Sequence, residues 1–168
     1  QSDGMCGEET VEERLRVSLS VSGLSPDENA VSQVLSEWRL EHRRADRVSQ
    51  LSGGQRRRLA VLCGLVPATF SENPRVVLLD EPSEGLDEFG RALLTGWLRA
   101  IALDGHSVLV ATHDECVVRC ADRVIVVQDS LLIESSGLSE GKPSKLPKPS
   151  QSIEPSTHGS LIRWAIRM

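Results

Sequence analysis

The sequence predicts an α/β fold, in which strands of a parallel sheet are flanked by helices and preceded by a helical subdomain. Three apolar runs, at residues 76–79, 107–111 and 123–127, are continuous rather than alternating, as in strands that are buried on both faces. Helical segments separate these runs. A strand–helix–strand order favours right-handed crossovers between parallel strands, so we expect part of a parallel sheet here.

The helical subdomain is expected to contain three helices. The first covers residues 10–24, where acidic residues occupy the first turn and apolar residues recur near helical spacing. The second begins at Ser25, the expected cap, with Pro26 in the first helical position, and it extends to about residue 40. The third follows a basic connection and covers residues 55–65. Its three arginines at 56–58 are expected to form a solvated face that contacts nearby acids or phosphates.

The remaining part alternates strands with helices. Helices are expected at residues 89–103 and 115–121, between successive strands, and a surface loop at 67–73 before the first strand. From about residue 137 the sequence is rich in Ser, Pro and Lys and has too few apolar residues for a core, which predicts a disordered linker. Residues 161–168 are apolar and basic again, and they are either the start of a further element or an interfacial helix.

The composition is that of an ordinary soluble protein, and it disfavours several functions. With 39% hydrophobic and 26% charged residues, 168 residues are enough for one domain with a sizeable core. A net charge of -5 disfavours electrostatic binding to nucleic acid, and an aromatic share of 3% with no Tyr disfavours base-stacking surfaces. No apolar run reaches the roughly 18–20 residues of a membrane helix, and the first residues lack the pattern of a signal peptide.

The four cysteines are too few and too scattered for a secreted disulfide framework, which favours a reducing, cytosolic compartment. His113, Cys116 and Cys120 could share one helical face and bind a metal. A structural zinc site requires four ligands, and a fourth is not apparent. We therefore disfavour a zinc site.

Two acidic residues end the first expected strand. Asp80 and Glu81 follow its apolar run directly, and Pro82 then stops the strand. Acids at strand ends are common and usually solvated, so the pair alone does not distinguish a structural from a catalytic role. His113 stands 33 positions after Asp80, at the end of the second expected strand. A lone His is also more often a satisfied surface or core residue, and its spacing from Asp80 is what makes it a candidate.

A glycine pair precedes the third expected helix, in the segment Leu51-Ser52-Gly53-Gly54-Gln55. Glycines at a helix N-terminus let backbone N–H groups approach an anion closely, and the helix dipole favours negative charge there. Ser52 adds a hydroxyl donor. The alternative is a Gly-Gly turn that caps a helix by chance.

In their order and spacing, four segments resemble the ATP-binding-cassette (ABC) ATPases: Leu51–Gln55, Val76–Pro82, Ser83–Asp87 and Ala111–Asp114. The resemblance covers nearly everything from Gln1 to about Ser136, and it implies a partial P-loop NTPase-like fold and the hydrolysis of ATP with Mg²⁺. The expected domains are a helical and signature subdomain, the C-terminal part of the catalytic core, the linker and the further element, at residues 1–66, 67–136, 137–160 and 161–168.

The resemblance also implies roles for individual residues. Asp80 helps to hold Mg²⁺, often through water, and Glu81 polarises the attacking water as a general base. His113 corresponds to the family's switch histidine, which contacts the γ-phosphate and orients the water. Gln1 corresponds to a glutamine that senses Mg²⁺ and the transport subunit. An arbitrary terminal Gln is the alternative for this position.

Two further sets of residues are expected to act between subunits. The signature loop closes over the γ-phosphate of a nucleotide held by a facing subunit, and it consists of Ser52, Gly53, Gly54 and Gln55. The segment after Pro82 is expected to face the dimer interface, and its residues there are Ser83, Gly85, Leu86 and Asp87. Asp87 stands seven positions after Asp80, as the resemblance requires.

The implied partners are a second ABC ATPase subunit, identical or different, and a transmembrane permease subunit or domain on which residues 10–47 dock. We therefore expect a cytoplasmic protein at the inner face of a membrane, with no nucleic acid bound. One alternative is a soluble cassette protein acting on ribosomes or DNA, but no basic insertion or coiled-coil arm is visible and Gln55 favours the transporters. Another is a catalytically silent remnant, against which the presence of Asp80, Glu81 and His113 argues.

The chain departs from the family pattern in two places. No G-x-x-x-x-G-K-[ST] phosphate loop occurs in the sequence, so this polypeptide alone is not expected to have full ATPase activity. The interval from Leu51 to Asp80 is longer than usual, and we place the extra residues in a surface insertion around residues 67–73.

Overall fold

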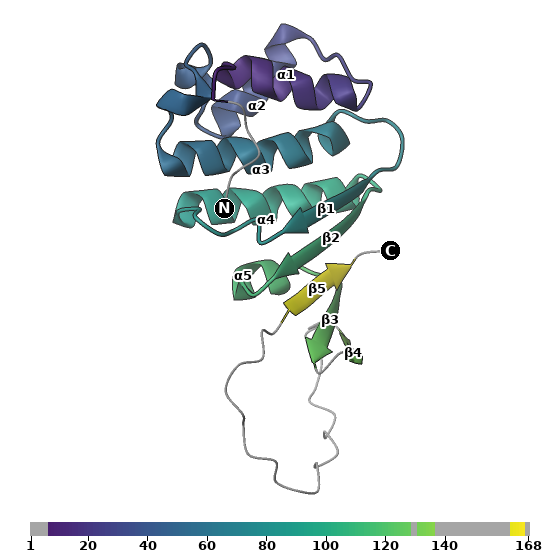
Figure 1. The fold of residues 1–168 in the computed structure, drawn as a ribbon. Helices are drawn as coiled ribbons and strands as arrows, with labels where there is room; N and C mark the ends of the chain where they lie inside the picture. Colours follow the sequence, from purple (N-terminus) through teal and green to yellow (C-terminus); the bar gives the residue numbers. More distant parts are fainter. Residues whose placement is uncertain (1–6, 129–130, 137–161, 167–168) are drawn as a thin grey trace, which may run out of the picture.

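The computed structural model describes residues 7–128, 131–136 and 162–166. Figure 1 shows three layers: the helices α1, α2 and α3 at one end, the helix α4 in the middle and the strands at the other end. The α-helices are α1 (Val11–Val21), α2 (Glu28–Glu37), α3 (Gly53–Thr69), α4 (Glu88–Leu103) and α5 (Glu115–Val118). Two 3₁₀ turns, η1 (Glu41–Arg43) and η2 (Val48–Gln50), connect α2 to α3.

Each α-helix begins at a polar side chain that accepts a hydrogen bond from its first turn, and these caps are Thr10, Asp27, Ser52, Asp87 and Asp114. The expectation that Ser25 caps the second helix is therefore wrong. The carboxylate of Asp27 accepts from the N–H of Ala30 at 2.8 Å, so Pro26 lies before the cap rather than inside the helix.

Among the described residues, the sheet contains five strands in the order β1-β2-β5-β3-β4. The strands are β1 (Val76–Asp80), β2 (Ser107–Thr112), β3 (Arg123–Gln128), β4 (Leu131–Ser136) and β5 (Ile162–Ile166). β1 and β2 pair in parallel. β5 is antiparallel to both β2 and β3, so the three strands expected from the sequence all run in one direction. β4 and β5 run the other way and were not foreseen. The interfacial-helix alternative for residues 161–168 is wrong, because residues 162–166 form a strand.

The helices cover one face of β1 and β2. α3 packs on α1, α4 and β1, and a Cβ at Gly64 of α3 would meet the Leu79 side chain at 3.4 Å. Val77 pairs with Val108 in the sheet, and both side chains are buried on this face. Val76 and Leu78 point to the opposite face and are 70% and 68% exposed.

The helical part has a dense core around Trp38, which is fully buried at the end of α2. Its ring meets Trp97 of α4 edge-on, with ring centroids 5.6 Å apart. Beside it, the Arg39 guanidinium lies 3.6 Å from the centre of the Phe89 ring. These contacts fasten the end of α2 to α4 and thereby join the helical part to the layer that covers the sheet.

The expected loop at residues 67–73 is only partly correct, because α3 continues through Pro67 to Thr69. Proline removes one backbone hydrogen bond and usually ends a helix. Here Val66 and Ala68 are 0% and 1% exposed, and burying these side chains favours the extra turn. Residues 67–73 are therefore divided between the end of α3 and a short connection to β1.

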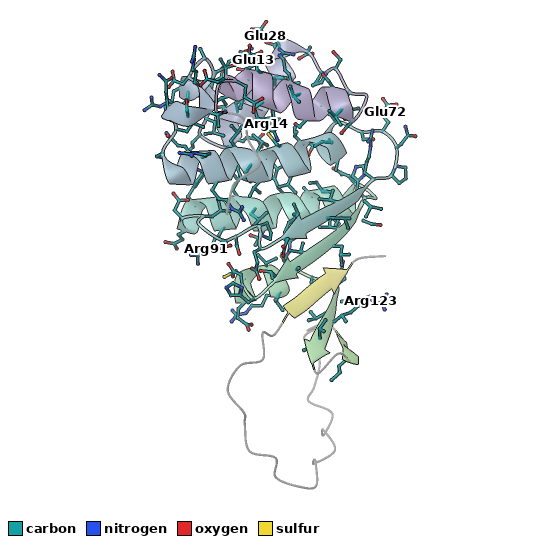
Figure 2. The ribbon with its side chains drawn as sticks, viewed as in Figure 1. Glu13, Arg14, Glu28, Glu72, Arg91 and Arg123 are labelled. Atoms are coloured by element: carbon teal, nitrogen blue, oxygen red, sulfur yellow. The ribbon has the colours of Figure 1, made fainter. Side chains whose placement is uncertain are left out.

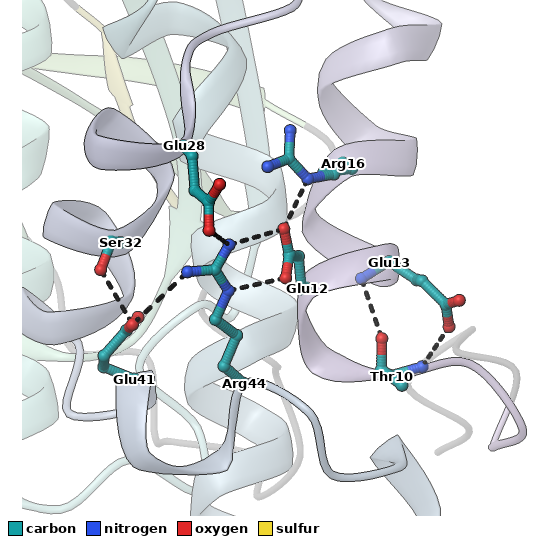
Figure 3. Close-up of polar contacts among 8 residues, drawn as sticks. All are labelled: Thr10, Glu12, Glu13, Arg16, Glu28, Ser32, Glu41 and Arg44. Carbon is teal, nitrogen blue, oxygen red and sulfur yellow. Dashed lines mark hydrogen bonds and ion pairs between the residues drawn. The ribbon is translucent and has the colours of Figure 1, made fainter.

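A polar network holds the starts of α1 and α2 to η1 (Figure 3). The Arg44 guanidinium donates to both carboxylate oxygens of Glu12, at 2.6 and 2.8 Å, and to Glu28 at 3.1 Å. Arg16 donates to Glu12 at 2.7 Å. The hydrogen bonds from Arg44 and Arg16 lower the pKa of Glu12 to about 2.

None of the helices in residues 7–128 is long and apolar enough to cross a membrane.

Candidate functional site

The candidate catalytic residues lie where β1 and β2 end. Asp80 is the last residue of β1, and Glu81 follows it with a positive φ of 42°, which is uncommon for a residue with a side chain. The N–H of Glu81 donates to the carbonyl of Ala111 in β2 at 2.8 Å. This bond continues the β1–β2 pairing by one residue and fixes Glu81 at the carboxyl edge of the sheet.

Glu81 and His113 form a hydrogen-bonded pair at this edge. The Nδ1 atom of His113 lies 2.8 Å from one carboxylate oxygen of Glu81, and the hydroxyl of Thr112 donates to the other at 3.3 Å. The hydrogen bond to Glu81 raises the pKa of His113, with smaller contributions from the nearby acids Asp114 and Glu84. The His113 side chain is 75% exposed, so its other ring nitrogen is open to an incoming ligand. The arrangement suits a carboxylate that accepts a proton from water beside an imidazole that contacts an anion.

The carboxylate of Asp80 is a suitable ligand for Mg²⁺, but Asp80 alone does not make a complete metal site. Its carboxylate is exposed at the end of β1, and carboxylate oxygen is a ligand that Mg²⁺ prefers. In the described part of the chain no three His, Cys, Asp or Glu side chains are grouped so that they could hold a metal ion. Mg²⁺ in proteins commonly takes one or two carboxylates and completes its shell with water and substrate phosphates, which fits Asp80 as a single ligand. Gln1 lies outside the described residues.

The segment after Pro82 is partly buried in the interior of this chain. Ser83 and Leu86 are buried, at 5% and 4% exposure, whereas Gly85 and Asp87 are exposed. Asp87 caps α4 by accepting from the N–H of Gly90 at 2.8 Å. From α4, Arg91 (labelled in Figure 2) donates to the carbonyl of Leu86 at 3.2 Å. A role of this segment in a dimer stays a prediction, and its exposed residues Gly85 and Asp87 are the ones that a partner could contact.

The signature loop begins α3 with a capping box. Ser52 Oγ accepts from the N–H of Gln55 at 3.3 Å, and the Gln55 side-chain oxygen accepts from the N–H of Ser52 at 3.0 Å. This bond uses Ser52 as an acceptor and leaves its hydroxyl proton for another partner. Ser52, Gly53 and Gly54 are all exposed.

The glycines of this loop have no structural requirement among the described residues. A Cβ at Gly53 or Gly54 would meet nothing within 4 Å, and neither residue has a positive φ. Gly90 differs, because a Cβ there would lie only 3.0 Å from the Asp87 carboxylate. The absence of side chains at 53 and 54 therefore leaves bare N–H groups at a helix N-terminus, where an anion can approach.

The three arginines after the signature loop do not form a solvated face, which corrects the expectation from the sequence. All are half-buried, and each donates to a backbone carbonyl. Arg56 donates to Leu51 and Arg58 to Trp38, whereas Arg57 donates to Glu81 and Glu84. The sequence shows the arginine run but not these acceptors, since every residue offers a carbonyl.

The structure therefore brings together some of the candidates and separates others. Glu81 and His113 touch, and Asp80 is next to them in the chain. Figure 1 shows the N-terminus of α3 on the same side of the molecule as the carboxyl ends of β1 and β2. No hydrogen bond within residues 7–128 joins residues 52–55 directly to Glu81 or His113. The connection between the two sets runs through Arg57.

Comparison with known proteins identifies the family of the chain. The family described as ABC transporter matches residues 1–84. The Nod factor export ATP-binding protein I of Bradyrhizobium diazoefficiens is 36% identical over 149 residues, which are 87% of this chain and 45% of that protein. The macrolide export ATP-binding/permease protein MacB of Azoarcus sp. is 30% identical over 142 residues, 83% of this chain and 21% of that protein. The chain thus spans less than half the length of these relatives.

A solved structure shows the same fold. It is a dimeric ATP-binding cassette in a post-hydrolysis state bound to ADP and Pi, with a TM-score of 0.66 and 26% identity over 81% of this chain and 60% of that one. The chain belongs to the ABC transporter family.

Proposed function

We propose that this chain supplies the catalytic edge and the signature loop of an ATP-hydrolysing cassette that drives a membrane transporter. The observation that carries the proposal is the contact between Glu81 and His113 at the ends of adjacent parallel strands. A carboxylate held in this way can accept a proton from the attacking water, and His113 can contact the transferred phosphate.

The signature loop is proposed to act on a nucleotide held by another subunit. The supporting observation is that Gly53 and Gly54 lack any steric need for glycine in the described structure. The solved relative is itself a dimer bound to ADP and Pi, which makes a composite site a reasonable arrangement for this chain. Because the sequence contains no phosphate loop, the chain by itself is proposed to have little or no turnover.

The transport partner is proposed from the names of the relatives. One relative is an export ATP-binding protein and another combines ATP-binding and permease functions. We propose that residues 10–47, with α1 and α2, dock on a permease subunit or domain at the inner face of a membrane. A cassette acting on ribosomes or DNA is the alternative. It would be recognised by ATP-dependent binding to those partners without any permease.

The test of hydrolysis uses a cassette in which this sequence is joined to a segment that carries the phosphate loop. Glu81→Gln should abolish multiple turnover but preserve ATP-dependent dimerisation, because the amide keeps the shape of the carboxylate and cannot accept the proton. Normal turnover in this variant would contradict the assignment of the general base.

The test of the signature loop uses Gly54→Ala in the same cassette. An added methyl group meets nothing in the chain itself, so we expect unchanged or slightly higher stability, by up to about 0.5 kcal/mol, since alanine restricts the unfolded state. Hydrolysis should nevertheless fall, because the methyl group would occupy the space next to the partner's phosphate. Gly96→Ala in α4 is a matched control, since its Cβ also meets nothing within 4 Å. Equal activity of the two variants would argue against the composite site.

A further inference from the structure

Arg57 connects the helix that begins at the signature loop with the turn that starts at Glu81. In the proposed function, the loop serves the partner's nucleotide and Glu81 serves the chain's own site. It lies one turn into α3, the helix that begins at the signature loop. Its Nε atom donates to the carbonyl of Glu84 at 2.8 Å, and its Nη2 atom donates to the carbonyl of Glu81. Hydrogen bonds from a charged guanidinium are roughly twice as strong as neutral ones.

The packing around Arg57 adds a second contact. Gly85, with a φ of 73°, comes so near that a Cβ there would lie 3.7 Å from the Arg57 Cγ atom. The side chain therefore lies along the turn that starts at Glu81. The N–H of Glu84 also donates to the Glu81 carbonyl, at 3.1 Å, so this oxygen accepts from both the turn and the arginine.

The residue whose carbonyl is held in this way is itself in an unfavourable backbone conformation. Glu81 has a φ of 42°, and a residue with a side chain persists in this region only when its surroundings hold it there. Ala111 holds its N–H from the side of β2, and Arg57 holds its carbonyl from the side of α3. Together these bonds orient the peptide units on both sides of Glu81 and thus the direction of its carboxylate toward His113.

We propose that Arg57 is a positioning residue that transmits a displacement of the signature loop to the catalytic Glu81 of the same chain. This proposal rests on the proposed function, in which the signature loop serves the partner's nucleotide and Glu81 serves the chain's own site. Arg57 then couples the two composite sites of a dimer, because a shift of α3 acts through the arginine on the two carbonyls that it holds.

The test needs no nucleotide and uses the chain of 168 residues. Arg57→Met removes the donors and keeps a similar apolar stem, whereas Arg58→Met removes the same charge one residue later, where the arginine donates to Trp38 instead. The readouts are amide hydrogen exchange at Glu84 and NMR titration of the His113 ring, assigned with His113→Gln.

In Arg57→Met we expect the Glu84 amide to exchange roughly tenfold faster or more, since the turn loses both hydrogen bonds from the arginine and keeps only its own backbone bonds. We also expect the titration midpoint of His113 to fall, because a reoriented Glu81 no longer bonds its ring. The sign is informative: removal of a cation by itself would raise the affinity of a nearby imidazole for a proton. The charged groups that face His113 are Glu81, Asp114 and Glu84, and none of them is altered by the substitution.

Arg58→Met should leave both readouts as in the wild type. Arg57→Lys, a milder variant that can reach one carbonyl, should give intermediate values and also covers the case in which Arg57→Met does not fold. In a double-mutant cycle, Ser52→Ala should change Glu84 exchange only while Arg57 is present. Wild-type exchange and titration in both Arg57 variants, or additive effects in the cycle, would overturn the proposal. Failure of hydrolysis in the joined cassette would refute the proposed function without altering these readouts.

Discussion

The helical part of the chain and the sheet differ in how completely each buries its apolar side chains. In the helical part, residues facing the shared core of α1, α2 and α3 are almost fully buried, and Leu15, Leu35 and Leu62 have no exposed surface. In the sheet, β1 buries only the face toward α3, and Val76 and Leu78 on its other face are largely exposed. The helical part is thus closed by its own helices together with α4, whereas the described elements cover only one side of β1.

The two parts also differ in their polar contacts. The network around Arg44 joins α1, α2 and η1 to one another and does not involve the sheet. At the sheet edge, by contrast, His113 is largely exposed, and its contact with Glu81 lies open to solvent on one side. Closed packing is suited to a rigid support, and exposed polar groups at the ends of strands are suited to binding a ligand.

The largest effect on the free energy of unfolding is expected from a leucine-to-alanine substitution in the helical part. The same substitution in the sheet should have a much smaller effect. Leu62→Ala in α3 should lower the free energy of unfolding by about 3 kcal/mol, because it leaves a cavity in a fully buried site. Leu78→Ala in β1 should cost less than about 0.5 kcal/mol, because its side chain is mostly exposed. Urea denaturation followed by circular dichroism measures both. A large loss of stability for Leu78→Ala would mean that this face of β1 is covered in solution, contrary to the exposure of Leu78 in the structure.

A smaller effect is expected from the polar network. Arg44→Met should cost about 2 kcal/mol at neutral pH, since the Glu12 carboxylate loses its main partner. The pKa of Glu12 is lowered from 4.5 to about 2 in the folded chain, so its stabilisation is complete above pH 4.5 and is lost as the pH falls toward 2. The difference between wild type and variant should therefore shrink when unfolding is measured at pH 3 rather than pH 7.

Arg43→Met is the control for this prediction, because Arg43 pairs with Asp46 in an exposed position, at 44% exposure of the arginine. It should cost less than about 0.5 kcal/mol, with little change between the two pH values. If Arg43→Met and Arg44→Met lost the same free energy of unfolding at both pH values, the network around Arg44 would contribute no more to stability than an exposed ion pair.

The smallest effect is expected from the helix caps, and it should be similar in the two parts. Asp27→Ala removes the cap of α2, and Asp87→Ala removes the cap of α4, which covers the sheet. Each should cost about 1 kcal/mol, because each leaves one N–H at the helix start without its partner. Asparagine at either position should restore most of the loss. Thermal unfolding measures the loss of stability in each variant. Unequal losses would show that the two helix starts differ in exposure to water.

Much of the fold and part of the site could be predicted from local patterns. The strands expected at residues 76–79, 107–111 and 123–127 are confirmed as β1, β2 and β3, each one residue longer, because buried parallel strands have a continuous apolar signature. The third helix is expected from residue 55, and α3 begins two residues earlier, at Gly53, after its cap Ser52. The pair of Glu81 and His113 was anticipated as a set through the resemblance to the ABC ATPases, and the structure places the two in contact.

Other features depend on contacts between distant segments and could not be predicted in this way. The acceptors of Arg57 are backbone carbonyls, which all residues possess, so no sequence pattern identifies Glu81 and Glu84 as its partners. The short β5 strand takes its place between β2 and β3 through hydrogen bonds with both, and its sequence alone is equally suited to a helix or a strand. Its neighbours in the sheet decide the conformation.

The amino-acid sequence was enough to identify the family, the first three strands and the candidate residues for the chemistry, because these depend on residue type and on short spacings along the chain. Only the tertiary structure decided the direction of β5, the buried state of Ser83 and Leu86 and the positive φ of Glu81. The physical reason is that each of these follows from which groups are left to bond or bury when distant segments pack, and packing is a property of the whole fold.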